Sequence, residues 1–105
     1  MDSNTYANHL LNQIAVLNYT NLYLEDLVEK YPIYNPALSV TTEQLKDLWK
    51  QYYYYSTNYV DQINQDLENK ILELKKYTDS INRIVDTVEK AKKTVGLVAE
   101  LIALF

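Results

Sequence analysis

The sequence predicts an all-α protein, and three features of the chain support this fold class. Residues 41–105 contain no proline and a single glycine, so little in this stretch breaks a helix. A strict seven-residue series of apolar residues runs through it and comprises Val60, Leu67, Leu74, Ile81, Val88, Val95 and Ile102. Residues 3–30 repeat apolar side chains at three- and four-residue steps. We expect one domain over residues 1–105, a helical hairpin whose second member is a long coiled-coil helix.

The first helix is expected over residues 3–30. Its apolar face comprises Ala7, Leu10, Ile14, Leu17, Leu24, Leu27 and Val28, and is widened by Leu11, Ala15 and Leu22. Asp2 or Ser3 can accept a hydrogen bond from the free amides of the first turn. Several asparagines in this segment are mediocre helix residues, so the helix is expected to depend on packing against the rest of the protein.

Residues 31–41 are expected to form the loop between the two helices. Pro32 and Pro36 each disfavour helical geometry in the residue before them. The loop also carries several apolar side chains, namely Ile33, Tyr34, Ala37, Leu38 and Val40. A loop this apolar is expected to pack against the helices.

The start of the second helix is the clearest local pattern in the chain. Thr41 and Gln44 match the capping box, in which the two side chains bond the free amides of a helix start. Val40 and Leu45 match the hydrophobic staple that accompanies it. The second helix is therefore predicted to begin at Thr42.

The second helix is expected to continue from residue 42 to residue 105. At 1.5 Å per residue it would be about 95 Å long, whereas the first helix would measure about 42 Å. The hairpin would therefore leave the long helix uncovered beyond about residue 70, and that half would need another partner. A break near Ser56, Thr57 and Asn58 is one alternative to the continuous helix.

Another alternative is a closed three-helix up-down-up bundle with a turn near residues 77–82. Lys75 and Lys76 suit the end of a helix, and Asp79 or Ser80 can cap the next one. No glycine or proline marks such a turn, however, and the seven-residue series passes through it without a slip. The continuous helix is therefore favoured.

The C-terminal half of the long helix is expected to be a surface for self-association. Apolar residues flank the seven-residue series on both sides, and a stripe this wide favours a bundle or a coiled coil of more than two helices. The alternative is an ordinary core helix of one bundle. The predicted oligomer interface comprises Leu74, Ile81, Val85, Val88, Val95, Val98, Ile102 and Phe105.

Residues 94–105 form a tail in which Glu100 is the only charged residue. Its apolar residues occupy every face of a helix, and a helix of this kind is buried. Burial against protein is favoured, and insertion into a membrane surface is the alternative, because lysines precede the tail. The residues that would contact a membrane are Lys92, Lys93, Leu97, Leu101, Leu104 and Phe105.

Tyrosine is unusually frequent, with 11 residues against one phenylalanine and one tryptophan. Four consecutive tyrosines surround a helix at about 100° per residue, so they do not all face one core. Some rings are expected in the core, and the others are candidates for contact with a partner, since Tyr and Trp are enriched at interfaces. The candidate contact residues are Trp49, Tyr52, Tyr53, Tyr54, Tyr55 and Tyr59. A nucleic-acid partner is disfavoured, because the net charge is −4 and base stacking needs a basic groove.

The sequence contains no pattern for catalysis, for a metal or for a cofactor. Cysteine is absent, and His9 is the only histidine and has no acidic residue three or four positions away. One glycine cannot form a glycine-rich phosphate loop. We expect a protein that is not an enzyme and that binds no cofactor.

Localisation is predicted from the absence of targeting segments. The N-terminal residues lack the basic region and cleavage pattern of a secretory signal, and no apolar run reaches the roughly 20 residues that span a bilayer. A cytoplasmic or virion-associated protein is therefore expected. The composition, rich in Tyr, Asn, Ile and Lys, is similar to that of small proteins from viruses and plasmids of hot-acid archaea, which implies a viral or plasmid-type component.

The sequence thus predicts a non-enzymatic, self-associating helical protein with a structural, assembly or adaptor role. Its expected partner is another copy of itself or another helical protein. Two alternatives remain: a peripheral membrane protein that inserts the C-terminal tail, and a monomeric three-helix module that binds or inhibits another protein.

Overall fold

The computed structural model describes residues 1–80 and 88–104, and these form a bundle of α-helices. The helices are α1 (Ser3–Lys30), α2 (Asn35–Thr57), α3 (Gln65–Asp79) and α4 (Val88–Leu104), with a short 3-10 helix η1 (Pro32–Tyr34) between α1 and α2. The described residues contain no strand, which confirms the predicted all-α class. The first helix covers the range expected from its apolar repeat.

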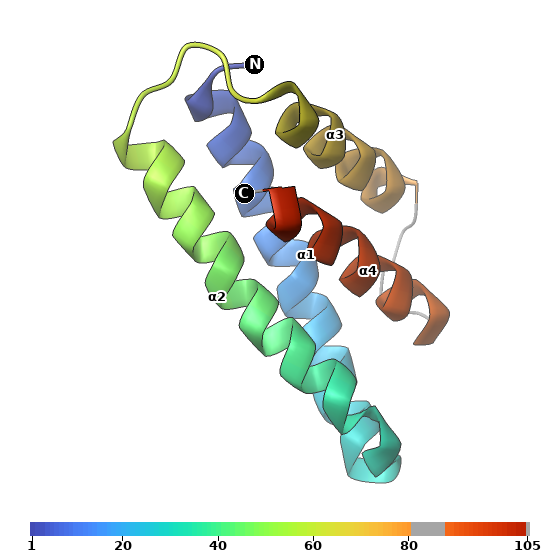
Figure 1. Cartoon of the computed structure of the whole chain (residues 1–105). Helices are drawn as coiled ribbons and strands as arrows, with labels where there is room; N and C mark the ends of the chain where they lie inside the picture. Colours follow the sequence, from blue (N-terminus) through green and yellow to red (C-terminus); the bar gives the residue numbers. More distant parts are fainter. Residues whose placement is uncertain (81–87, 105) are drawn as a thin grey trace.

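The four helices pack as two antiparallel pairs (Figure 1). The α1–α2 hairpin is the longer pair, and η1 lies at its tip. The α3–α4 pair covers only part of this hairpin, with α3 against α1 and α4 against α2. The hairpin tip therefore projects beyond α3 and α4, and the molecule is elongated, with extents of 47 × 25 × 18 Å.

The second helix begins at Asn35, well before the predicted Thr42. Pro36 lies in its first turn, where a missing amide proton and a fixed φ favour a helix start, so this proline begins a helix instead of ending one. Thr41 is therefore not a cap. It is buried inside α2, and its hydroxyl lies 2.9 Å from the Leu38 carbonyl and 2.8 Å from Oδ1 of Asn21.

The single long helix expected over residues 42–105 is interrupted after Thr57. At this point polar side chains compete for the last carbonyls of α2. The Thr57 hydroxyl donates to the Tyr53 carbonyl at 2.7 Å, and the Asn58 side-chain amide donates to the Tyr54 carbonyl at 3.0 Å. The break begins within residues 56–58, which is the position of the alternative prediction of an interrupted helix.

The segment between α2 and α3 is held by the start of the chain. The Ser3 amide donates to the Val60 carbonyl at 2.9 Å, and the Val60 amide donates back to Oγ of Ser3 at 2.8 Å. The Ile63 amide donates to the Met1 carbonyl at 3.0 Å. These bonds satisfy backbone groups that a continuous helix would have paired locally. The interruption therefore does not carry the free-energy cost of unpaired backbone groups.

The third helix ends at Asp79, within the range proposed for a turn, and Asn64 caps its start by accepting from the Asp66 amide at 2.7 Å. Residues 81 and 82 of that range lie outside the described residues. The three-helix bundle is nevertheless wrong, because the described residues already form four α-helices.

One hydrophobic core joins all four helices and the segment before α3. Its buried members are Tyr6, Leu10, Ile14, Leu17, Leu48, Ile63, Leu67, Ile71, Leu74, Leu97, Val98 and Leu101. Each large side chain of this kind contributes about 1.5–3 kcal/mol when it leaves water. The apolar C-terminal tail is therefore buried largely by its own chain. In the described part of the chain, no helix is both long enough and apolar enough to cross a membrane.

Candidate interaction surfaces

The described residues of the predicted oligomer interface are fully or partly buried within the molecule. Leu74 and Val98 have no exposed surface and belong to the core, so they cannot contact another copy while the bundle is folded. Val88, Val95 and Ile102 are half-buried. The other predicted members, Ile81, Val85 and Phe105, lie outside the described residues. Among the described members of the seven-residue series, Leu67 and Leu74 of α3 are buried in the core of the same chain, and those in α4 are half-buried.

The residues predicted to contact a membrane divide in the same way. Leu97 and Leu101 are buried in the core, which removes them from any lipid surface. Lys92, Lys93 and Leu104 are exposed, and Phe105 lies outside the described residues. Among the described residues of this tail, Leu104 is the exposed large apolar side chain, and one such residue does not make a continuous apolar face.

A small apolar pocket of about 100 Å³ lies between α4 and the hairpin. It is lined by Leu24, Tyr34, Ala37, Val88, Ala91, Lys92 and Val95. Small-molecule sites usually exceed about 300 Å³ and place several polar groups around the ligand. This pocket has neither property.

The tyrosine run of α2 divides between core and surface. Tyr52 and Tyr55 are half-buried and pack on the core, and the Tyr55 ring meets the Tyr6 ring edge-on with centroids 5.0 Å apart. The exposed members of the predicted contact set are Trp49, Tyr53, Tyr54 and Tyr59. Tyr53 is 71% exposed and lies one turn beyond Trp49, so these two rings form an aromatic patch on the outside of α2.

Buried polar side chains connect the helices, and sequence reasoning missed them. The Tyr6 hydroxyl of α1 donates to Oε1 of Gln51 of α2 at 2.7 Å, and burial raises the pKa of Tyr6. Gln44 of α2 donates from Nε2 to the Val95 carbonyl of α4 at 2.8 Å. Both glutamines are almost fully buried, although glutamine in a sequence normally indicates a surface position.

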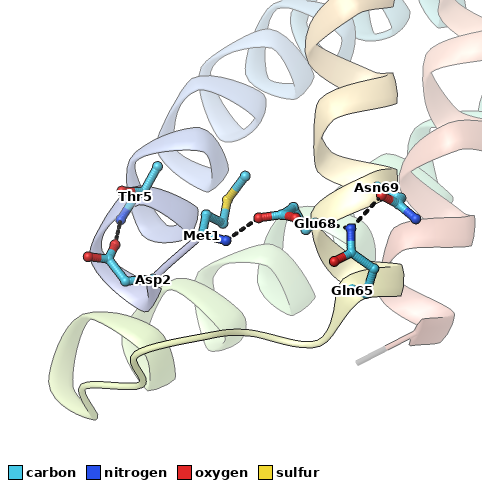
Figure 2. A network of polar contacts seen from close by, with 6 residues as sticks. All are labelled: Met1, Asp2, Thr5, Gln65, Glu68 and Asn69. Carbon is cyan, nitrogen blue, oxygen red and sulfur yellow. Dashed lines mark hydrogen bonds and ion pairs between the residues drawn. The ribbon is translucent and has the colours of Figure 1, made fainter.

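An ion pair joins the start of the chain to α3 (Figure 2). The Met1 ammonium forms an ion pair with the Glu68 carboxylate, and the hydrogen bond from this ammonium lowers the pKa of Glu68. Gln65 donates from Nε2 to Oε2 of Glu68 at 3.0 Å and to Oδ1 of Asn69 at 2.9 Å. This network fixes the first turn of α1 beside the first turn of α3.

The outer face of the α3–α4 pair is charged. Lys70 of α3 lies 2.8 Å from Glu73 and 2.7 Å from Glu100 of α4, and the hydrogen bond with Glu100 raises the pKa of Lys70. Lys75 pairs with Asp79 at 2.6 Å. The charged side chains of such a face are solvated by water and form ion pairs with one another.

The outer face of α1 has a different character. Its exposed positions include Asn4, Asn8, Leu11, Ala15, Asn18, Leu22, Glu25 and Glu29, which we call the outer stripe of α1. Leu22 is 58% exposed, and Tyr19, which flanks the stripe, is 66% exposed. Residues 3–24 contain no Asp, Glu, Lys or Arg. Leu11, Ala15 and Leu22 were expected to widen the buried face of this helix, but they lie outside the core.

Residues 1–80 and 88–104 hold no group of three or more His, Asp or Glu side chains arranged for a metal ion. Nδ1 of His9 is buried and has no hydrogen-bond partner among these residues, and no carboxylate holds it as a catalytic base requires. The surfaces described above are the basis for inferring a function, because comparison with family models, curated proteins and solved structures gave no match.

Proposed function

We propose that the protein is a non-enzymatic helical module that associates with copies of itself and has a structural, assembly or adaptor role. The observation that carries this proposal is the outer stripe of α1, an exposed helix face with leucines and no charged side chain before Glu25. A surface helix of a monomer normally presents charged residues to water. An uncharged face of five turns that exposes Leu11 and Leu22 is typical of a contact surface.

The charge distribution favours a second copy as the partner. The chain carries a net charge of −4, so two copies repel each other over most of their surfaces. The outer stripe of α1 is where this repulsion is weakest, because its first five turns are neutral. The described α3–α4 surface is more charged: it carries the ion pairs of Lys70 and Lys75, and its exposed large apolar side chains are Leu72 and Leu104.

The proposal is tested by sedimentation velocity and light scattering of the 105-residue chain over a wide concentration range. We expect a species larger than the monomer whose fraction rises with protein concentration. The matched control is Glu43→Lys on α2, an exposed position away from the stripe, which should leave the association unchanged. A monomer at every concentration up to about 1 mM, the weak limit of specific association, would overturn the proposal.

The aromatic patch on α2 supports a second candidate, the binding of a different protein. Trp49 is 48% exposed and packs edge-on against Tyr52 with centroids 5.7 Å apart, so it presents a preformed ring surface. Exposed Trp and Tyr rings are typical anchors of protein interfaces. Trp49 is the only tryptophan, and its emission therefore reports directly on this patch. A change of that emission on association would favour α2 over α1 as the contact.

A further inference from the structure

The outer stripe of α1 has the spacing of a coiled-coil contact line. Its positions, from Asn4 to Glu29, follow one another at alternating steps of four and three residues, and each of them is exposed. A repeat of this kind keeps one line of side chains facing a partner helix along its whole length. No helix of the described chain occupies this face, because these positions are exposed in the folded bundle.

Building on the self-association proposed above, we infer that two copies pair through this stripe with their α1 helices antiparallel. In this arrangement Leu11 of each copy packs against Leu22 of the other. Two layers lie between the leucine contacts, and each pairs Ala15 of one copy with Asn18 of the other. Ala15 is small, and small residues at the centre let two helix backbones approach closely.

The acidic end of the stripe determines the orientation. A parallel pair would bring Glu25 and Glu29 of both copies side by side, and like charges at adjacent positions destabilise a helix pair. The antiparallel pair instead places Glu25 opposite Asn8 and Glu29 opposite Asn4 of the second copy. Asparagine side-chain amides donate hydrogen bonds, and ionised carboxylates accept them.

The helix dipole favours the same orientation. Carboxylates are stabilised near a helix N-terminus and destabilised near a C-terminus. Glu25 and Glu29 lie in the last turns of their own α1, where the dipole has the wrong sign for them. In the antiparallel pair these two carboxylates lie beside the N-terminal turns of the other α1, which have the right sign. The spacing of the stripe, the repulsion between glutamates and the helix dipole therefore all favour the antiparallel pair.

Disulfide cross-linking tests this register directly, because the chain has no cysteine of its own. Asn8→Cys and Glu25→Cys are prepared as separate variants, and neither change removes an apolar side chain from the stripe. Oxidation of the mixture should give a covalent dimer containing one copy of each variant, as measured by intact mass. Each variant oxidised alone should stay uncrosslinked, because its two cysteines lie about 25 Å apart along the helix axis and a disulfide needs Cα atoms within about 7 Å.

The control mixture combines Glu25→Cys with Lys50→Cys, an exposed position on α2, and measures random collision. Homodimers formed by each variant alone would show parallel pairing and overturn the inference. If the wild-type chain associates but the Asn8–Glu25 mixture cross-links no more than the control, self-association stands and the α1 register is wrong. A monomeric wild-type chain would overturn both proposals.

Substitution of one leucine gives an independent measurement. Leu22→Lys should raise the dissociation constant at least tenfold, because it puts a charge into a layer that pairs two leucines. Leu22 is exposed in the single chain, so the helical circular dichroism of the variant should match that of the wild type. An unchanged dissociation constant would exclude Leu22 from the interface and overturn the inference.

Discussion

The α1–α2 hairpin and the α3–α4 pair belong to one bundle but differ in what they present to solvent. The α3–α4 pair carries ion pairs on its outer face, and Lys70 even joins the two helices by contacting Glu73 and Glu100. The hairpin leaves Leu22 and Trp49 exposed on its own outer faces. The α3–α4 pair also exposes Leu72 and Leu104, but the hairpin exposes more large apolar and aromatic side chains in the described part of the chain.

The interiors differ as well. Hydrogen bonds between buried side chains fix how α1 and α2 pack, since Tyr6 binds Gln51 and Thr41 lies beside Asn21. The inner faces of α3 and α4 are mostly aliphatic: Leu74 is fully buried there, and the buried Thr94 hydroxyl bonds the Lys90 carbonyl of its own helix. Polar contacts specify one register, while aliphatic packing supplies most of the free energy of folding. Each region is therefore vulnerable to a different kind of substitution.

The largest effect is expected at Leu74, which was predicted to be an interface residue and is a core residue instead. Leu74→Ala should lower the free energy of unfolding by about 2–5 kcal/mol, because it leaves a cavity between helices. The neighbouring Leu72→Ala, at an exposed position of the same helix, should change it by less than about 0.5 kcal/mol. Urea denaturation measures both. If the Leu74→Ala chain is as stable as the wild type but associates less, Leu74 is an interface residue and not a core residue.

The next largest loss of stability is expected when a buried hydrogen bond between the two helices of the hairpin is removed. Tyr6→Phe should destabilise the protein by about 1–3 kcal/mol, because Oε1 of Gln51 loses its donor in a buried site. The double variant Tyr6→Phe/Gln51→Leu should recover much of this loss, since it leaves no unpaired polar atom. Tyr53→Phe at an exposed ring is the control and should be neutral. Additive effects of the two changes in thermal unfolding would show that the bond is unimportant.

A smaller effect, of opposite sign, is expected in α4. Gly96 lies exposed within this helix, and a Cβ added there meets no atom within 4 Å. Gly96→Ala should therefore stabilise the protein by about 0.5–1 kcal/mol through the helix propensity of alanine. Ala99→Gly, at another exposed position of α4, should destabilise it by a similar amount. A loss of stability in Gly96→Ala would mean that another group occupies this side of the helix.

The sequence predicts those features that depend on local repeats. The all-α class and the range of α1 follow from apolar residues at helical spacing. The start of α2 does not follow, because Pro36 fits both the end of a loop and the first turn of a helix. The capping box at Thr41 fails for a related reason: its hydroxyl serves equally well inside a helix, where it lies beside the Leu38 carbonyl.

The remaining differences arise from contacts between distant residues. The interruption after Thr57 is stabilised by two hydrogen bonds between Ser3 and Val60, which no local pattern reveals. The seven-residue series does not cross this interruption, because its first member, Val60, already lies in the segment between α2 and α3. The outer stripe of α1 was visible as leucines at helical spacing, but the sequence does not tell which face of a helix is covered. Burial in the folded chain supplies that distinction.

The junction between the two regions provides the smallest expected effect and a test by pH. Glu68 is ionised and paired with the Met1 ammonium in the folded chain, and this pairing lowers the pKa of Glu68. A carboxyl whose pKa is lowered on folding stabilises the protein above its unfolded pKa, and that stabilisation is lost as the pH falls through the folded pKa. The stability difference between the wild type and Glu68→Gln should therefore be constant near neutral pH and shrink below pH ~4. Glu89→Gln, at an exposed carboxylate of α4, is the control in urea denaturation at each pH. If the Glu68 difference is the same at pH 7 and pH 3, the ion pair does not hold α1 to α3, and this junction depends on other contacts, among them the hydrogen bonds of Ser3 and Ile63.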